Sequence, residues 1–284
     1  MNPRFTKFHG LGNDYLVIEQ SALEGVADLG DFARRICNRH YGAGADGIAV
    51  INRLTSEEAD FRCRIFNPDG SEAGLSGNGT RCAVAYLYYT GSWNEPKLRL
   101  ITRTGLKTYF LRAQPKPGKY VFESELGQPK FDPASIPMIV NGSLTKVMDY
   151  PLVVAGQTVE VTALQMGNPN CCIFVDNFDA LNWRALGKAI ENDKQFPDRT
   201  NVVFVRVIDR NSLEMRIWER GVGETSASGT CSCAGAVASM INGETDREVR
   251  VTMPGGEANI KWREDDEVVI TASAEVVYKG EWLG

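Results

Sequence analysis

The chain has 284 residues, of which 43% are hydrophobic and 24% charged, and its formal net charge is −5. This balance fits a globular protein of one large or two medium domains, and it provides no broad positive field for nucleic acid or an anionic membrane. No segment approaches the roughly 20 apolar residues of a membrane span, and no signal-peptide core is found, so we expect a cytoplasmic protein with a small-molecule partner.

Alternating apolar and polar residues predict strands in both halves of the chain. Residues 98–103 and 107–112 alternate on either side of Thr104-Gly105, and residues 152–154 and 158–161 flank a second short turn. Both patterns predict β-hairpins. The tail also alternates, and its last strand could return to the first half of the chain.

The most linker-like composition is the Pro- and Gly-containing segment 114–119. Such segments often separate domains. We therefore expect an N-terminal domain of residues 1–118 plus 266–284 and a C-terminal domain of residues 119–265.

A gapless internal repeat relates the two halves at an offset of 152 residues. Arg64-Ile65-Phe66 aligns with Arg216-Ile217-Trp218, and Ser76-Gly77 aligns with Ser228-Gly229. Each Ser-Gly precedes an apolar run that ends at a glycine. Each half therefore reads as strand, Gly-rich loop, Ser-Gly and helix.

The two repeated helices are apolar nearly all round, which is typical of buried helices. We expect an α+β fold of two pseudo-twofold-related domains, each a sheet wrapped around a central helix. The helix N-termini present free N–H donors suited to a carboxylate, and two of them facing one ligand would hold Ser76 and Ser228 on opposite sides of it. That is the geometry of a two-base racemase. The alternative is that both serines are only N-caps.

The seven cysteines do not have the paired spacing of a zinc site, and only two histidines are present. We therefore expect buried, reduced thiols and no metal.

Motifs along nearly the whole chain resemble the diaminopimelate epimerase family. The first matching motif is HGLGNDY at residues 9–15, and its HGLGND part separates the chain from the related proline racemases. The other matching motifs are Gly44-Ala45-Asp46-Gly47, Phe66-Asn67-Pro68-Asp69-Gly70-Ser71-Glu72-Ala73, Gly77-Asn78-Gly79-Thr80-Arg81-Cys82, Met166-Gly167-Asn168-Pro169, Thr200-Asn201-Val202, Glu219-Arg220-Gly221-Val222-Gly223-Glu224-Thr225 and Met253-Pro254-Gly255-Gly256.

The resemblance implies a cofactor-independent isomerase, without pyridoxal phosphate, that interconverts LL- and meso-diaminopimelate in lysine and peptidoglycan biosynthesis. It implies a ligand cleft between the two domains and a homodimer formed through the strand around Tyr278. The catalytic positions fall on Ser76 and Ser228. The substrate-binding positions fall on Asn13, Asn67, Gly77, Asn78, Asn168, Asn201, Glu219, Arg220, Gly229 and Thr230.

The chain departs from this family where the chemistry is expected. The family has cysteines at the positions of Ser76 and Ser228 and a histidine at the position of Asn170. A hydroxyl is a much weaker acid than a thiol, so serine is a weak base without help. Cys231, three residues after Ser228, is a candidate for a displaced base. A matched pair of introduced serines would leave position 170 unchanged, so Asn170 favours natural divergence.

Two classes of function therefore stay open. The first is an epimerase that uses Ser76 and Ser228 as its acid and base, or else a lyase or racemase that acts on a related amino acid. The second is a non-catalytic amino-acid-binding homologue that keeps the pocket and has lost the chemistry.

Overall fold

The computed structural model describes residues 2–55 and 57–284, which form two compact units. Unit 1 is Met1–Ser124 with Thr271–Gly284, and unit 2 is Glu125–Ile270. The linker-like segment 114–119 is the turn of a hairpin in unit 1, where Lys116 pairs with Lys119. The boundary between the two units falls a few residues later, after Ser124. It lies inside the strand Lys119–Gly127, which runs from unit 1 into unit 2 without a break.

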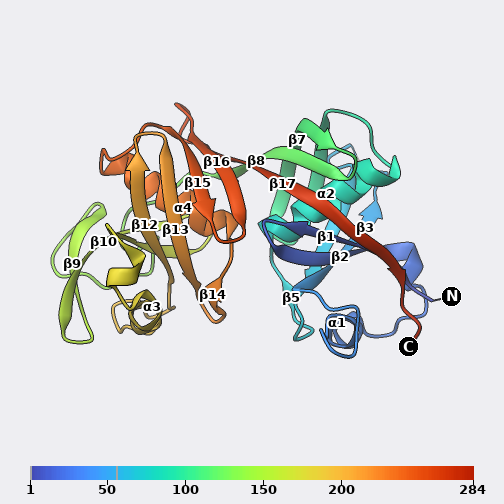
Figure 1. Ribbon diagram of the computed structural model, residues 1–284, viewed down its shortest axis with the longest axis horizontal. Helices are drawn as coiled ribbons and strands as arrows, with labels where there is room; N and C mark the ends of the chain where they lie inside the picture. Colours follow the sequence, from blue (N-terminus) through green and yellow to red (C-terminus); the bar gives the residue numbers. More distant parts are fainter. Residues whose placement is uncertain (1, 56) are drawn as a thin grey trace. The chain divides into compact units, whose positions relative to one another are not determined.

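Unit 1 contains strands on both sides of one long helix (Figure 1). In chain order its elements are β1 (Arg4–Gly10), β2 (Asn13–Glu19), the 3-10 helix η1 (Gln20–Leu23), α1 (Leu29–Ile36), β3 (Gly47–Arg53), β4 (Phe61–Phe66), β5 (Glu72–Ala73), α2 (Gly77–Thr90), β6 (Lys97–Thr102), β7 (Gly105–Lys116) and β8 (Lys119–Gly127), with most of β17 (Val268–Glu281).

Unit 2 repeats this order, with one more strand before its 3-10 helix. They are β9 (Val147–Val154), β10 (Gln157–Gln165), β11 (Pro169–Phe174), the 3-10 helix η2 (Phe178–Ala180), α3 (Trp183–Glu191), β12 (Asn201–Asp209), β13 (Ser212–Glu219), β14 (Gly223–Thr225), α4 (Gly229–Ile241), β15 (Glu248–Met253) and β16 (Gly256–Trp262).

The strand pairing confirms the repeat seen in the sequence. In unit 1, β2 pairs parallel with β3, β3 antiparallel with β4, and β4 parallel with β6. In unit 2, β11, β12, β13 and β15 pair in the same way. Each parallel step encloses a helix, as parallel connections require. The two long helices begin 152 residues apart, at Gly77 and Gly229.

The expected hairpins are present, because β6 pairs antiparallel with β7 and β9 with β10. The tail forms one strand, β17, which pairs antiparallel with β1 and so returns to unit 1.

The central sheet of unit 1 is buried on both faces. Successive side chains of a strand point to opposite faces, so Val17 of β2 joins the core around α2 while Leu16 and Ile18 join the core around α1. Ala49 and Ile48 of β3 divide in the same way. This is why β2 and β3 read as continuous apolar runs.

The two long helices are the buried central helices that the sequence predicts. Helix α2 packs against β1, β2, β3 and β4, and α4 packs against strands β10–β13, β15 and β16. Helix α2 ends at Gly91, whose φ of 72° is the left-handed conformation typical of a glycine stop. Burying these helices fixes the position of each N-terminus within its unit.

All seven cysteines are buried, and none of them forms a disulfide among the described residues. In the described ranges, no helix is long and apolar enough to cross a membrane.

Candidate active-site residues in each unit

Ser76 lies at the N-terminus of α2 and is partly buried. Its Oγ accepts a hydrogen bond from the backbone N–H of Gly79 at 3.0 Å, so Ser76 is an N-cap residue. The same oxygen lies 2.8 Å from the hydroxyl of Tyr15 on β2. Ser76 is therefore both a cap and the centre of a small polar cluster.

Asn13 and Asn78 meet beside this helix N-terminus. Asn78, only 4% exposed, donates from its side-chain amide to Asn13 Oδ1 at 3.2 Å. Asn78 also accepts a hydrogen bond from Arg81, one turn further along α2. Asn13 donates to Asp46 Oδ2 at 2.7 Å. The two amides therefore have fixed orientations.

A network of charged side chains surrounds Asp14, the residue that follows Asn13 on β2. Asp14 pairs with Lys7 at 2.7 Å and with Arg39 at 2.8 Å, and it accepts the Asp46 N–H. Burial acts to raise the pKa of the Asp14 carboxyl, but hydrogen bonds from Arg39 and Lys7 hold that pKa well below its usual range. Asp14 is thus a fixed anion, and it anchors the strand that carries Asn13.

The other two candidates of unit 1 lie on its surface. Asn67 forms a turn in which its amide donates to Ser71 Oγ at 3.0 Å. Gly77, the first residue of α2, is exposed, and a Cβ built on it would meet nothing within 4 Å. The backbone N–H end of α2 is therefore open to a ligand.

Ser228 occupies the equivalent position on α4 but is held differently. It is 7% exposed and makes no side-chain cap hydrogen bond. The carboxyl of Glu219, the last residue of β13, lies close to it. Burial raises the pKa of Glu219, and the hydroxyls of Thr225 and Ser228 lower it in part. A carboxyl with a raised pKa beside a hydroxyl is suited to proton transfer.

Three asparagines form a chain across the strands next to α4. Asn170, fully buried, donates to Asn168 Oδ1 at 3.0 Å and accepts from Asn201 at 3.2 Å. Asn168 also donates to Thr230 Oγ1 at 3.3 Å, in the first turn of α4. Asn201 accepts the backbone N–H of Arg220 at 2.9 Å. Asn170 thus joins two of the predicted binding residues.

The Arg220 side chain is exposed and donates to the Asp198 carbonyl at 2.9 Å. Gly229 opens α4, where the nearest atom to a built Cβ is Ile270 Cδ1 at 3.9 Å. As in unit 1, the helix N-terminus has room beside it.

The structure gathers most of the sequence-predicted residues into two clusters, one in each unit. Unit 1 joins Asn13 and Asn78 near Ser76, and unit 2 joins Asn168, Asn201 and Thr230, with Glu219 beside Ser228. Asn67 stands apart, in a turn. Cys231 is fully buried, and burial raises the pKa of its thiol well above the usual range, which makes it a poor displaced base.

Sequence reasoning assigned no role to Tyr15 or Asp46. Both belong to motifs that the sequence analysis singled out, but their partners Ser76 and Asn13 lie 61 and 33 residues away in the chain. The pairing of β2 with β3 brings Asp46 to Asn13, and the packing of α2 against β2 brings Ser76 to Tyr15.

The same fold is found in solved structures of other proteins. A Bacillus anthracis phenazine biosynthesis protein of the PhzF family matches with a TM-score of 0.68 at 17% identity, and covers 100% of both chains. A probable proline racemase from Agrobacterium radiobacter matches with a TM-score of 0.68 at 12% identity over 99% of this chain and 93% of that one. At these identities the likeness shows the fold alone.

Sequence comparison is more specific. The family model described as diaminopimelate epimerase matches residues 5–130 and 162–278. Diaminopimelate epimerases from Pelotomaculum thermopropionicum and Desulfitobacterium hafniense are each 40% identical, over 279 and 281 residues, and cover 98% of this chain and 98% and 97% of their own lengths. The chain belongs to the diaminopimelate epimerase family.

Proposed function

We propose that this protein interconverts LL- and meso-2,6-diaminopimelate in the cytoplasm by moving the proton at one α-carbon, with no cofactor. The observation that carries the proposal is the matched pair of hydroxyls, Ser76 and Ser228, each at the open N-terminus of a buried central helix. The proposal requires both hydroxyls to reach one α-carbon, from opposite sides.

In this reaction Ser228 and Glu219 form the base. The Glu219 carboxylate takes the proton of Ser228 as the serine oxygen takes the α-proton, so the serine need not exist as a free alkoxide. Ser76 delivers its own proton to the other side of the carbon. The raised pKa of Glu219 brings this carboxylate closer to the basicity that the step needs.

The remaining candidates would hold the substrate. The N–H groups at the start of α2 and α4, from Gly77, Asn78, Gly229 and Thr230, are suited to the carboxylate at the reacting carbon and to the charge that develops on it. Arg220 would bind a carboxylate of the substrate. The amides of Asn13, Asn67, Asn168 and Asn201 would bind its other polar groups.

Proton NMR of LL-diaminopimelate in deuterated buffer tests the proposal. We expect deuterium to appear at the α-carbon and the meso isomer to accumulate. Binding without any exchange would favour the non-catalytic homologue. Exchange without the meso isomer would indicate one-sided chemistry, and neither binding nor exchange would contradict the substrate assignment.

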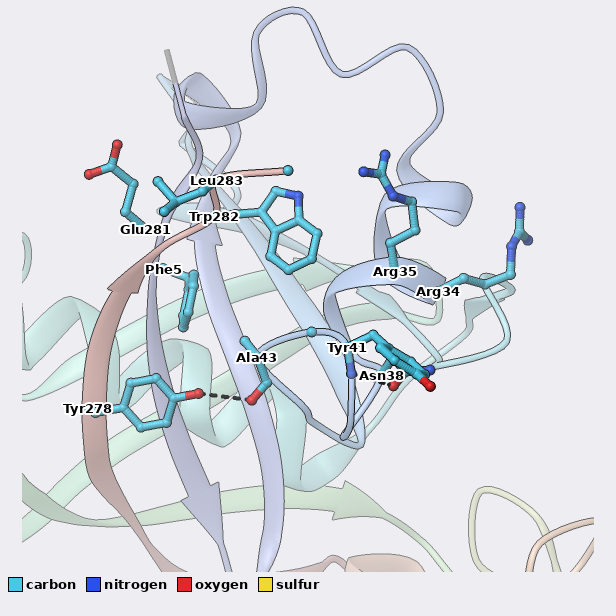
Figure 2. Close-up of a pocket in the computed structure, with 12 residues that line it drawn as sticks. Phe5, Arg34, Arg35, Asn38, Tyr41, Ala43, Tyr278, Glu281, Trp282 and Leu283 are labelled. Carbon is cyan, nitrogen blue, oxygen red and sulfur yellow. Dashed lines mark hydrogen bonds between the residues drawn. The ribbon is translucent and has the colours of Figure 1, made fainter.

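We also propose that the protein is a homodimer that pairs through the face around Tyr278. A hollow of about 920 Å³ opens there, lined by aromatic and apolar side chains together with Arg34, Arg35, Asn38 and Glu281 (Figure 2). Tyr41 and Leu283 at its rim are 89% and 80% exposed, which is unusual for large apolar residues in a monomer. Tyr278 and Ala43 both line the hollow, and the Tyr278 hydroxyl donates a hydrogen bond to the Ala43 carbonyl at 2.9 Å.

Sedimentation velocity tests this pairing. We expect the parent protein to be a dimer, and Tyr41→Asp with Leu283→Asp to be a monomer, because two charges would be buried in the interface. Val153→Asp is the matched control, since Val153 is 64% exposed on unit 2. A monomeric parent, or a double variant that still dimerises, would contradict the proposal.

A further inference from the structure

We infer that Tyr15 supports Ser76 as a hydrogen-bond donor. Its hydroxyl donates to the serine oxygen and stabilises the negative charge left there when Ser76 gives up its proton. The inference rests on the proposed function for its meaning in catalysis. Its physical content, a phenol that lowers the proton affinity of the group at position 76, can be tested separately.

The position of the Tyr15 ring is fixed by its surroundings. Tyr15 is 5% exposed and lies between two glycines. A Cβ at Gly47 would stand 2.7 Å from Tyr15 Cε1, and one at Gly79 would stand 2.8 Å from the same atom. Atoms this close cannot coexist, so the ring occupies the space that both glycines leave free. Its hydroxyl is therefore delivered to one place.

That place is the Ser76 oxygen, 2.8 Å from the Tyr15 hydroxyl. A serine oxygen has two acceptor sites and one proton. The Gly79 N–H fills one acceptor site at 3.0 Å. When Tyr15 fills the other, the serine proton is left to point toward a ligand. Two donors on one oxygen, at a helix N-terminus, favour the anionic form.

The proton balance is simple. The Oγ–H bond of Ser76 breaks as a C–H bond forms at the substrate carbanion, and the charge on Oγ is held by the O–H of Tyr15 and the N–H of Gly79. After the product leaves, Glu219 releases the proton that it took from Ser228 to water, and water returns a proton to Ser76. Ser228 has no side-chain cap hydrogen bond and lies beside a carboxyl. In this direction of the interconversion Ser76 is therefore the donor and Ser228 the acceptor, and in the opposite direction the two residues exchange these roles.

Tyr15 acts through Ser76, so it is a positioning residue, and a thiol can report on it without any substrate. In Ser76→Cys, the introduced thiol would be the reactive one, because the seven native cysteines are buried. The pH dependence of its alkylation by iodoacetamide gives its pKa, against roughly 8.5 for an unperturbed thiol. Adding Tyr15→Phe removes one donor and keeps the ring.

We expect Tyr15→Phe to raise the pKa of the introduced thiol by on the order of one unit, or tenfold in its ionisation constant. Tyr109→Phe is the matched control, because the Tyr109 hydroxyl contacts Thr80 Oγ1 on the same helix at 2.5 Å and not residue 76. Equal pKa values in the two phenylalanine variants would overturn the inference. Urea unfolding of each variant shows whether the fold is kept.

The second measurement uses the protein with Ser76 in place. Tyr15→Phe should lower kcat for α-proton exchange about tenfold or more and leave KM within about twofold, since the hydroxyl acts after binding. A raised KM with an unchanged kcat would overturn the inference and make Tyr15 a substrate-binding residue. If the parent shows no exchange at all, the proposed function fails, and the thiol measurement still decides the role of Tyr15.

Discussion

Replacing Ser76 and Ser228 together by cysteine is expected to raise the rate of α-proton exchange on LL-diaminopimelate by a factor on the order of 100 or more. A thiol with a pKa of roughly 8.5 can ionise near neutrality at a helix N-terminus, whereas an alkyl hydroxyl cannot. Base efficiency follows the population of the basic form, and acid–base groups are typically worth roughly 10² to 10⁴ in rate. The structure supports both thiols, because each serine begins a helix.

The comparison is made by deuterium incorporation, with the parent, both single variants and the double variant at one pH. The control pair is Ser21→Cys with Ser143→Cys, which adds one exposed thiol to each unit away from the N-termini of α2 and α4. If the double variant exchanges no faster than the parent, the lack of thiols at positions 76 and 228 is not what limits the rate of exchange.

Glu219→Gln is expected to slow exchange by roughly 10² to 10⁴, because it removes the acceptor behind Ser228 and keeps the shape of the side chain. The parent's kcat/KM should fall at acid pH with a midpoint above the ordinary value for glutamate, since burial raises the pKa of Glu219. The variant should lose that acid limb. Glu224→Gln is the control, since Glu224 is exposed on the neighbouring strand and pairs with Arg184 at 2.5 Å.

Stability should move in the opposite direction from activity. The pKa of Glu219 is higher in the folded protein than in the unfolded chain, so its contribution is favourable only while it is protonated and is lost as pH rises through the folded pKa. At a pH above the folded pKa the buried charge opposes folding, and Glu219→Gln should raise the urea midpoint there. At a pH below both pKa values this difference should disappear. A variant that is both inactive and less stable at a pH above the folded pKa would instead indicate a structural role.

Most of the fold could be predicted from the internal repeat in the sequence. Hydrophobic runs and glycine stops are local signals, and the register of Ser76 with Ser228 needed only an alignment of the chain with itself. The division between units was harder to predict, because Pro115 and Gly118 mark a turn just as well as a linker. Only contacts between distant segments separate these two readings.

The residues of the candidate site also fall into those that local sequence signals predict and those that depend on contacts between distant segments. Residues at the helix starts could be named because they sit in the repeat itself. Tyr15 and Asn170 could not be assigned their partners, since each acts across strands through a contact that depends on pairing, β2 against α2 or β11 against β12. Asn170 appeared in the sequence only as a departure from the family pattern, and the structure shows it as the link between Asn168 and Asn201.

The return of β17 to β1 has a consequence for how the polypeptide emerges from the ribosome. Unit 2 is continuous in sequence, whereas unit 1 includes Thr271–Gly284, which is synthesised after the whole of unit 2. Until that segment is released, the flank of β1 that β17 will occupy has no strand on it, and such an edge can pair with other chains. The half of the molecule that is translated first is therefore the half that finishes folding last.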